Sequence, residues 1–382
     1  MRSRCASLLA ISLLGCGPSL PTLDDEVGDA SSEGSDGEPG TEGETSETSS
    51  SSTGEPTTDT DTTDETETSA DECPTSLHGG KVIITDESDL AYFACLEDAY
   101  WIEISASVTD LSFLSELEVS DHLRLRGTPN LVSLAGLDSL REVEWLEVED
   151  APNMVDLSGL PADFELYELI IGPGNAGLTS IALPRLAEPG LQFAFWDRPT
   201  LDILASASWP PHTIDVWHSE VLEELDAIAE CCVAQQATLS LTLTDTPLLT
   251  DLQGLEPFTM LGRFALLDTP EVVSLAGLAN LEQVDSLRLS NGCTYDGPAS
   301  LVDLQGLEQL AVVDSLSIQT QTALVSLAGL SMQLEVDSAI FERNLLLDQA
   351  LVDAWFAAAM PSGQHYSCGN IGSEPCDDFC PQ

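Results

Sequence analysis

Hydrophobic positions repeat with a nearly constant period between residues 73 and 344. A short motif opens with Asp or Ser, continues with Leu or Ile, and closes with a further Leu two or three residues later. Its copies begin at Asp110, Ser133, Asp156, Ser180, Asp251, Ser274, Asp303 and Ser326. The first two intervals are 23 residues each, and the last three are 23, 29 and 23 residues. A fixed period of roughly 20 to 29 residues predicts a repeat solenoid, in which each turn of the chain stacks on the one before.

Each repeat contains a strand, a turn and a run of spaced leucines. Leu123 and Leu125 alternate with polar residues, which predicts a strand with every second side chain directed inward. Pro129 then predicts a turn, because proline fixes φ and donates no hydrogen bond to a ladder. The Asp or Ser that opens the motif suits a side chain that caps a short helical turn. Gly136 and its equivalents recur at one position of the repeat, where we expect a backbone conformation or a close approach that only a residue without Cβ allows. The inward pairs are Ile102/Ile104, Leu123/Leu125, Leu146/Val148, Leu169/Ile171, Phe193/Phe195, Ile214/Val216, Leu241/Leu243, Phe264/Leu266, Leu287/Leu289, Leu316/Ile318 and Ala339/Phe341.

This pattern predicts a mainly β solenoid with one parallel, right-handed stack of about eleven rungs of ~23 residues. An earlier strand at residues 81–84 starts the stack. A solenoid needs polar ends, and residues 345–360 have the pattern of an amphipathic helix that Pro361 and Gly363 bring to an end. We therefore assign residues 73–344 to the solenoid and residues 345–382 to a capping helix with a Cys-rich tail.

The first residues have the features of an export signal. Arg2 and Arg4 precede an apolar run of nine residues, 6–14, which is far shorter than the roughly 20 residues needed to span a bilayer. The run ends in Leu13-Leu14-Gly15-Cys16, which resembles the bacterial lipobox, although Leu is less usual than Ala or Ser at the second position. The resemblance implies a signal peptide at residues 1–15 and a lipidated Cys16 that anchors the chain in the bilayer of a bacterial envelope, on the outer membrane or cell surface. A plain secretion signal with an incidental cysteine is the alternative.

Residues 16–72 join the lipidated cysteine to the solenoid. The stretch is rich in Ser, Thr, Gly and acids, with 18 acidic residues and no basic residue between Pro21 and Glu72. It offers almost nothing apolar to bury, so we expect a disordered linker that its own charge extends. Asp59, Asp61 and Asp64 lack the glycine turn and closing Glu of a calcium-binding EF-hand loop.

The whole chain is strongly acidic, with 11 Lys and Arg against 66 Asp and Glu and a formal net charge of −55. Nucleic acid is excluded as a partner because phosphate binding needs clustered Lys and Arg. Docking on an anionic membrane through a basic patch is excluded for the same reason.

Ten cysteines are present, and the lipobox resemblance implies that Cys5 leaves with the signal peptide and that Cys16 takes the lipid. The other eight are Cys73, Cys95, Cys231, Cys232, Cys293, Cys368, Cys376 and Cys380. An even number in an exported chain predicts disulfides, with Cys73 and Cys95 closing the first rung and the last three tying the tail. Adjacent Cys231 and Cys232 could be redox-active, bind a metal or form a strained disulfide. The plainer interpretation is structural pairing with each other or with Cys293.

The Leu-x-Leu, Leu-x-Gly-Leu and Leu-x-x-Val pattern with a cysteine-bounded first rung resembles the receptor L domain, a relative of leucine-rich repeats. The resemblance covers roughly residues 73–341. It implies a ligand-binding solenoid without catalysis or cofactor, which contacts proteins through its sheet face and loops. A typical L domain has about half as many rungs, so the chain is either one uninterrupted stack or two fused modules with a seam near residues 183–232.

Alternation also identifies the outward positions of the strands. Exposed aromatic residues on a flat sheet are candidate binding anchors. The candidate binding residues are Trp101, Trp145, Trp196, Trp217, Arg124 and Arg126. The alternative for the tryptophans is partial burial under flanking loops. For Arg124 beside Glu147, and Arg126 beside Glu149, the alternative is cross-strand charge pairing.

Catalytic and metal-binding motifs are missing from the sequence. None of the five histidines has the H-E-x-x-H spacing, and no G-x-S-x-G elbow or phosphate loop occurs. Asp110, Asp156, Asp251 and Asp303 align down the stack, but they alternate with Ser, which capping explains better than acid catalysis. We therefore expect a lipid-tethered, non-enzymatic module that recognises a protein or glycan. A structural or adhesive envelope component is the alternative, and a β-helix polysaccharide hydrolase or lyase is a lesser one.

Overall fold

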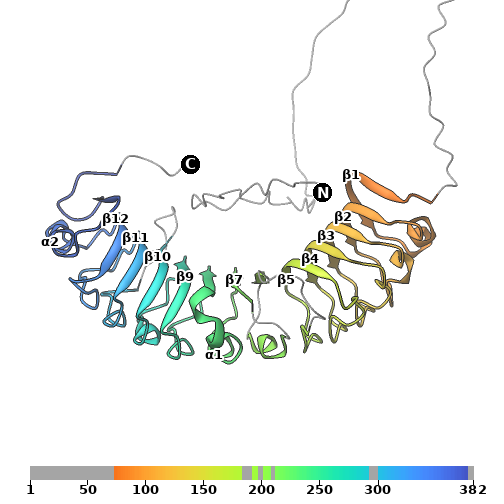
Figure 1. Cartoon of the computed structure of the whole chain (residues 1–382), viewed down its shortest axis with the longest axis horizontal. Helices are drawn as coiled ribbons and strands as arrows, with labels where there is room; N and C mark the ends of the chain where they lie inside the picture. The colour runs from red at the N-terminus through yellow and green to blue at the C-terminus, as the bar shows by residue number, and fades with distance from the viewer. Residues whose placement is uncertain (1–72, 183–191, 197–200, 208–210, 292–299, 377–382) are drawn as a thin grey trace, which may run out of the picture. The chain divides into compact units, whose positions relative to one another are not determined.

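The computed structural model describes residues 73–182, 192–196, 201–207, 211–291 and 300–376. In this part of the chain, thirteen strands form one sheet in which every strand pairs in parallel with the next strand in sequence. Figure 1 shows the strands side by side in chain order, with the turns and most of the short helices on the opposite side of the stack. The chain therefore has a solenoid-like, mainly β repeat fold.

The elements have the following bounds. The strands are β1 (Ser76–Ile84), β2 (Asp98–Ile104), β3 (Val119–Arg126), β4 (Glu142–Glu149), β5 (Glu165–Ile171), β6 (Gln192–Trp196), β7 (Thr213–Trp217), β8 (Ser240–Thr244), β9 (Met260–Leu267), β10 (Gln283–Ser290), β11 (Val312–Gln319), β12 (Glu335–Glu342) and β13 (His365–Cys368). The two α-helices of the described residues are α1 (Asp226–Cys232) and α2 (Gln349–Ala359). Short 3-10 helices cover Glu87–Phe93, Ser112–Leu114, Asp202–Ser206, Val233–Thr238 and Ala276–Leu278.

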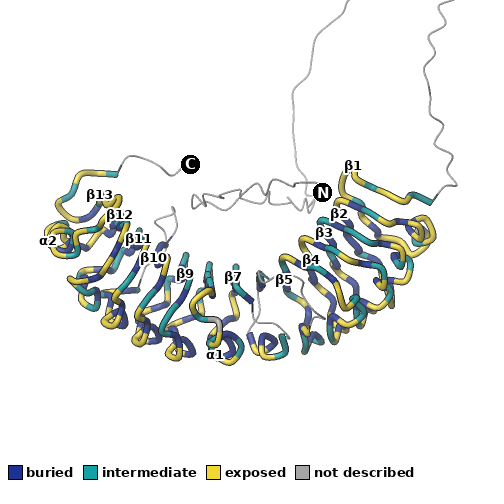
Figure 2. Tube along the Cα trace, in the orientation of Figure 1, coloured by how far each residue is buried: buried dark blue, intermediate teal, exposed yellow. Residues whose placement is uncertain are grey.

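The predicted inward pairs form the core. All eleven pairs are buried, and together with the spaced leucines of the turns they make one hydrophobic cluster. Figure 2 shows this buried layer beneath the sheet and the exposed residues concentrated in the turns. Strands β5 to β8 pair without interruption across the proposed seam near residues 183–232. The sheet is therefore continuous through the region where the leucine pattern weakens.

The turns repeat a hydrogen-bonding pattern that sequence analysis anticipated. Asp110 Oδ1 accepts from the backbone N–H of Ser112 at 3.0 Å, and Asp156 Oδ1 accepts from that of Ser158 at 2.9 Å. Ser274 Oγ does the same for Ala276 at 3.1 Å. Asp and Ser therefore share one role, in which the side-chain oxygen accepts from the N–H two residues later, and this explains why they alternate in this position. The expected helix cap is not formed by these residues, because the 3-10 helices at Ser112–Leu114 and Ala276–Leu278 have Leu111 and Leu275 as their N-caps.

Glycine is required at two of these turns because neighbouring rungs approach closely. Gly136 and Gly159 have φ of +107° and +110°, a conformation that L residues with a Cβ rarely adopt. A Cβ on Gly159 would overlap the backbone of Leu134 and Ala135 in the preceding turn. The close approach of two backbones at this point leaves no room for a side chain.

Buried asparagines connect the turns that follow the strands. Asn344 Oδ1 accepts from the N–H of Gln321 at 3.0 Å, and its Nδ2 donates to the carbonyl of Ile318, also at 3.0 Å. Asn370 in turn accepts from the N–H of Asn344 and donates to Phe341. Such side chains satisfy backbone groups that the turn leaves unpaired inside the protein.

The C-terminal end of the core is covered as predicted, but with different boundaries. The capping helix was expected over residues 345–360; α2 begins after Asp348, whose Oδ1 accepts from the N–H of Ala350 at 2.9 Å, and ends at Met360, which has φ of +47°. Trp355 of α2 is fully buried, and its Nε1 donates to the carbonyl of Ser331 at 3.0 Å. The sequence analysis missed β13, which pairs with β12 and extends the sheet into the Cys-rich tail.

Candidate functional site

The outward side chains of the strands form a surface that we call the sheet face. Strand register aligns these residues into rows that cross the sheet. The first row contains Lys81, Trp101, His122, Trp145, Glu168, Gln192, Thr213, Ser240, Arg263, Ser286, Ser315 and Ser338. The second row contains Ile83, Glu103, Arg124, Glu147, Ile170, Ala194, Asp215, Thr242, Ala265, Arg288, Ser317, Ile340 and Tyr366. Alternation along each strand thus predicted correctly which residues share this surface.

The sheet face collects most of the positive charge that the structure describes. Seven Lys and Arg residues lie in the described ranges, namely Lys81, Arg124, Arg126, Arg141, Arg263, Arg288 and Arg343. All except Arg141 and Arg343 lie on the sheet face, which leaves five of the seven there. The chain has a net charge of −55. The concentration of Lys and Arg therefore makes the sheet face chemically different from the acidic turns.

Arg124 is the centre of a charge network on β2, β3 and β4. Its Nε lies 3.2 Å from Glu147 Oε2, and one terminal nitrogen lies 2.7 Å from Glu149 Oε2. The other terminal nitrogen lies 3.7 Å from Glu103 Oε2, and Arg126 Nε lies 3.3 Å from Glu149 Oε2. The expected cross-strand charge pairs are therefore present, and they belong to a larger cluster in which one guanidinium faces three carboxylates.

Lys81 extends this network to the first strand. Its Nζ lies 2.6 Å from Glu103 Oε2 and 5.2 Å from the centre of the Trp101 ring. Burial alone would raise the pKa of Glu103. The hydrogen bond from Lys81 and the charges of Lys81 and Arg124 outweigh burial and hold that pKa below its ordinary value of 4.5. Glu103 is therefore a stable anion within the network.

An aromatic row lies beside the charges. The rings of Trp101 and His122 stack at a centroid distance of 3.9 Å, and His122 lies 5.9 Å from Trp145. Trp145 is 38% exposed, and its Nε1 donates to Glu168 Oε2 at 2.8 Å. Trp145 therefore presents an apolar ring to solvent while its polar atom is held in place, as an interface anchor requires.

Two carboxylates, the half-buried Glu168 and the buried Asp215, continue the surface towards β7. Gln192 Nε2 donates to Asp215 Oδ2 at 2.7 Å and to Glu168 Oε1 at 3.4 Å, and so bridges the two acids. Burial is the main cause that raises the pKa of both Glu168 and Asp215 above their ordinary values. Sequence reasoning did not select Asp215, although it occupies the same row as Arg124.

The four predicted tryptophans are divided between two places. Trp101 and Trp145 lie in the first row, whereas Trp196 and Trp217 pair with each other at the ends of β6 and β7. Three strand spacings separate β4, which carries Trp145, from β7, which carries Trp217, a distance of about 14 Å across the sheet. The side chain of Trp196 lies outside the described part of the structure. The candidate tryptophans therefore form a Trp101–Trp145 row and a separate backbone pair of Trp196 and Trp217.

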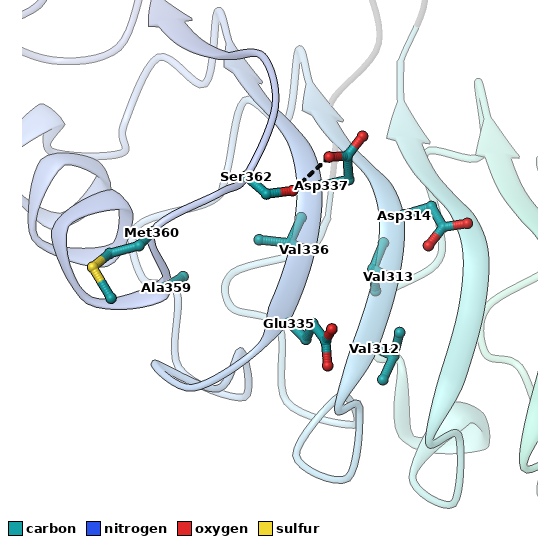
Figure 3. A pocket seen from close by; sticks show the side chains of 9 residues that line it. All are labelled: Val312, Val313, Asp314, Glu335, Val336, Asp337, Ala359, Met360 and Ser362. Carbon is teal, nitrogen blue, oxygen red and sulfur yellow. Dashed lines mark hydrogen bonds between the residues drawn. The ribbon is translucent and has the colours of Figure 1, made fainter.

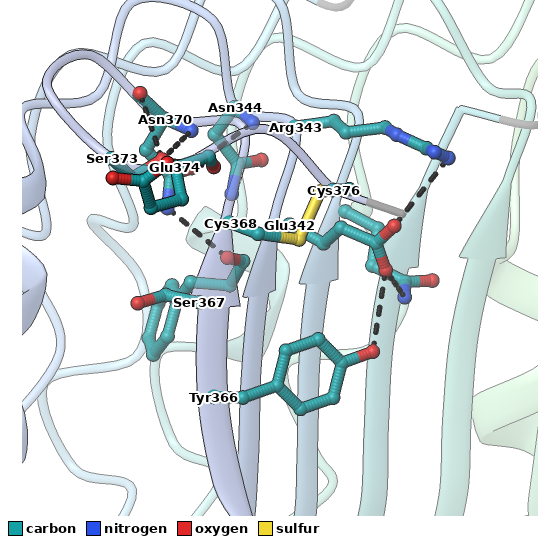
Figure 4. The surroundings of a disulfide bond; sticks show 12 residues. Glu342, Arg343, Asn344, Tyr366, Ser367, Cys368, Asn370, Ser373, Glu374 and Cys376 are labelled. Carbon is teal, nitrogen blue, oxygen red and sulfur yellow. Dashed lines mark hydrogen bonds and ion pairs between the residues drawn. A yellow bond between two sulfur atoms is a disulfide. The ribbon is translucent and has the colours of Figure 1, made fainter. Parts of the chain in front are cut away.

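Three disulfides occur among the described residues. They join Cys73 to Cys95, Cys231 to Cys232, and Cys368 to Cys376. The first confirms the predicted closure of the N-terminal rung, and the second selects pairing within the vicinal pair. Cys16, Cys293 and Cys380 lie outside the described residues. Glu342 lies beside Cys368 and Cys376 (Figure 4), but sulfurs bonded to each other are not the thiolates that bind metals.

A shallow pocket of about 210 Å³ lies beside the beginnings of β11 and β12. Figure 3 shows it between these strands and the end of α2, with Asp314, Glu335 and Asp337 at its edge. Ser362 Oγ donates to Asp337 Oδ1 at 2.6 Å. The pocket is small, open and acidic, and it contains neither a cation nor an aromatic side chain. We therefore place the candidate site on the sheet face.

Within the described ranges, neither α-helix is both long and apolar enough to cross a bilayer. Comparisons with protein-family models, with curated proteins and with solved structures each returned no match.

Proposed function

We propose that this chain is a tethered binding module that recognises a protein or glycan ligand through its sheet face. The observation that carries the proposal is the gathering of five of the seven described Lys and Arg residues, together with Trp145, on one surface of a chain with a net charge of −55. Aromatic and arginine side chains are the residue types that contribute most at binding interfaces.

The organisation of the face supports the same function. Arg124 and Trp145 are already held by Glu149 and Glu168, so their side chains have little rotational freedom left to lose. Side chains that are ordered before binding reduce the entropic cost of association. A ligand would meet a flat, pre-ordered surface in which a tryptophan ring adjoins a row of charges.

We also propose that the solenoid is of the leucine-rich type related to receptor L domains. The 23-residue spacing, the buried asparagines that join turns, and the disulfide between Cys73 and Cys95 support this subtype. The subtype would make the sheet face the usual contact surface.

The third part of the proposal is a lipid anchor at Cys16 that holds the module on a bacterial envelope. Replacement Cys16→Ser should move the protein from the membrane fraction to the soluble fraction and abolish labelling by a radioactive fatty acid. Cys5→Ser is the matched control and should leave both unchanged. Equal membrane retention in the two variants would contradict the anchor.

The binding function can be tested with the full chain on an array of glycans and on a panel of purified envelope proteins. Trp145→Ala should lower the affinity for any ligand that the wild type binds by about ten-fold or more, which corresponds to roughly 1.4 kcal/mol of binding free energy. Tyr92→Ala is the control, because Tyr92 is 49% exposed but lies in a 3-10 helix away from the sheet face. Equal losses in both variants, or no loss in either, would contradict a site on the face.

Two alternatives give different outcomes in related assays. A structural or adhesive component without a specific ligand would bind nothing in these panels and would depend on neither aromatic residue. A polysaccharide hydrolase is favoured only by Glu168 and Asp215, because a raised pKa is what a general acid needs. We expect no turnover of acidic polysaccharides, and turnover abolished by Glu168→Gln would establish the enzyme instead.

A further inference from the structure

Two arginines lie next to each other on the C-terminal half of the sheet face. Arg263 is in the first row on β9, and Arg288 is in the second row on β10. Register places Ser286 beside Arg263 and Ala265 beside Arg288, so the two arginines are diagonal neighbours on adjacent strands. Strand spacing and rise separate such Cα atoms by about 8 Å. Their long side chains can therefore reach the same small group from two sides.

These arginines differ from every other Lys and Arg that the structure describes. Lys81, Arg124, Arg126, Arg141 and Arg343 each lie within 4.0 Å of a carboxylate oxygen. No such ion pair involves Arg263 or Arg288 among the described residues, and Asp215 and Asp268 act on them only at longer range. In a chain with 66 acidic residues against 11 basic ones, two adjacent arginines without a salt bridge stand out from the rest.

Arg288 is in an unfavourable environment for a cation. It is half-buried, and its Nε is shielded from solvent without a hydrogen-bond partner. Burial lowers the pKa of Arg288, and the neighbouring charge of Arg263 lowers it further. A buried donor without a partner and a like-charged neighbour both cost folding stability. Arg288 therefore lowers the stability of the fold, and a role in binding accounts for its presence on the face better than a structural role does.

The surroundings of the pair indicate the chemistry of the ligand. Hydroxyl groups occupy most neighbouring positions on the face, and no aromatic side chain lies in its first two rows from β8 to β11. The hydroxyl-bearing positions are Ser240, Thr242, Ser286, Ser315 and Ser317. Guanidinium groups bind carboxylates and sulfates through paired hydrogen bonds, and the hydroxyls match a ligand that itself has many hydroxyl groups.

We propose that Arg263 and Arg288 form an anion subsite of the sheet face that binds the carboxylate or sulfate of an acidic sugar. The bound oxyanion supplies the counter-charge that no described residue of the chain places within ion-pair distance of the two guanidiniums. The net charge of −55 repels dense polyanions at long range, so the subsite suits a sugar residue with a single charge. This inference depends on the proposed binding function and names the ligand class for one end of the same surface.

The test measures binding of sodium glucuronate, glucose 6-sulfate and uncharged glucose to the full chain by isothermal titration calorimetry at low ionic strength. We expect at least one of the two charged sugars to bind saturably and glucose to bind at least about ten-fold more weakly, since hydrogen bonds between charged groups are stronger than those between neutral ones. The double variant Arg263→Gln/Arg288→Gln should bind the charged sugar about ten-fold more weakly than the wild type does. Arg141→Gln is the matched control, because Arg141 is 67% exposed and pairs with Glu118 away from the sheet face.

Stability provides a second measurement on the same variants. Thermal melts of Arg288→Gln should show a Tm equal to or above that of the wild type, because the removed charge has no partner to lose. A large fall in Tm would mean that Arg288 has a structural role, which would overturn the proposal. Equal binding of glucose and the charged sugars, or unchanged binding by the double variant, would also overturn it.

Additional measurements distinguish a sugar ligand from a protein ligand. They also distinguish failure of the arginine subsite from failure of the proposed binding function. A short Asp/Glu peptide that binds through the arginines while neither charged sugar binds would show that the ligand is a protein, contrary to the proposal. Sugar binding that falls in Trp145→Ala but not in the arginine double variant would leave the proposed function intact and remove only the subsite. Binding of no probe at all would remove the acidic-sugar subsite, while the array and protein panel test the wider function separately.

Discussion

Arg124 forms its shortest ion pair, 2.7 Å, with Glu149 Oε2, although the strand register places Glu147 directly beside it. The guanidinium spans two rows and also contacts Glu147 and Glu103. Its side chain is only 17% exposed. A single cation therefore bridges three carboxylates that would otherwise repel one another, and Lys81 and Arg126 supply the further positive charge.

Replacement Arg124→Met should destabilise the fold strongly. The change removes the common partner of three carboxylates that stay on the face, and breaking a buried pair in this way costs about 3 kcal/mol or more. Urea unfolding would measure the loss. Arg141→Met is the control, because an exposed pair contributes only about 0–1 kcal/mol. Similar losses at both positions would contradict the central role of Arg124.

Gly159→Ala should lower the free energy of unfolding by ~3 kcal/mol, since φ of +110° strains any residue with a Cβ and the new methyl group would overlap Leu134 and Ala135. Gly79→Ala provides the comparison, because a Cβ there meets no atom within 4 Å. Thermal and chemical unfolding should give a clearly lower Tm and free energy of unfolding for Gly159→Ala than for Gly79→Ala. If Gly159→Ala is neutral, adjacent rungs are farther apart than described.

Asn344→Ala should destabilise by about 2 kcal/mol, because the N–H of Gln321 and the carbonyl of Ile318 would be left buried without partners. The exposed Asn130, which donates one hydrogen bond to Ser107, is a suitable control for the same substitution. Hydrogen exchange should also report the change locally, as faster exchange of the Gln321 amide. Unchanged protection of that amide would argue against the described bond.

Asp215→Asn should raise Tm at pH 7. Burial raises the pKa of Asp215 above 3.8 in the folded protein, so the folded state binds this proton more tightly than the unfolded chain. Its contribution to stability therefore falls as the pH rises through the window between 3.8 and the raised value. The advantage of the variant should shrink as the pH is lowered towards 3.8.

Asp110→Asn should behave in the opposite way. Hydrogen bonds from the hydroxyl and backbone N–H of Ser112 lower the pKa of Asp110 below 3.8, so its carboxylate stabilises the fold above 3.8 and loses that effect as the pH falls. The variant should thus have a lower Tm at pH 7, with a smaller deficit in acid. The same sign of pH dependence in both variants would contradict the assignment.

Local pattern determined most of the architecture. The alternation at Leu123 and Leu125 identified strand and face together, because successive side chains of a strand point to opposite sides. The constant period then set the order and the parallel direction of the strands, and Cys73 and Cys95 marked the first rung. Each of these signals lies within one repeat or between repeats at a fixed separation.

Tertiary structure decided what depends on contacts between side chains of different rungs. Nothing local distinguishes Arg124, which faces three carboxylates, from Arg288, which lies within 4.0 Å of no carboxylate oxygen among the described residues. Strand β13 was also unpredictable, because four residues gain their hydrogen bonds only beside β12. The sequence thus determined the repeat and the side to which each residue points, whereas pairing, burial and charge compensation were set by neighbours that are more than twenty residues away along the chain.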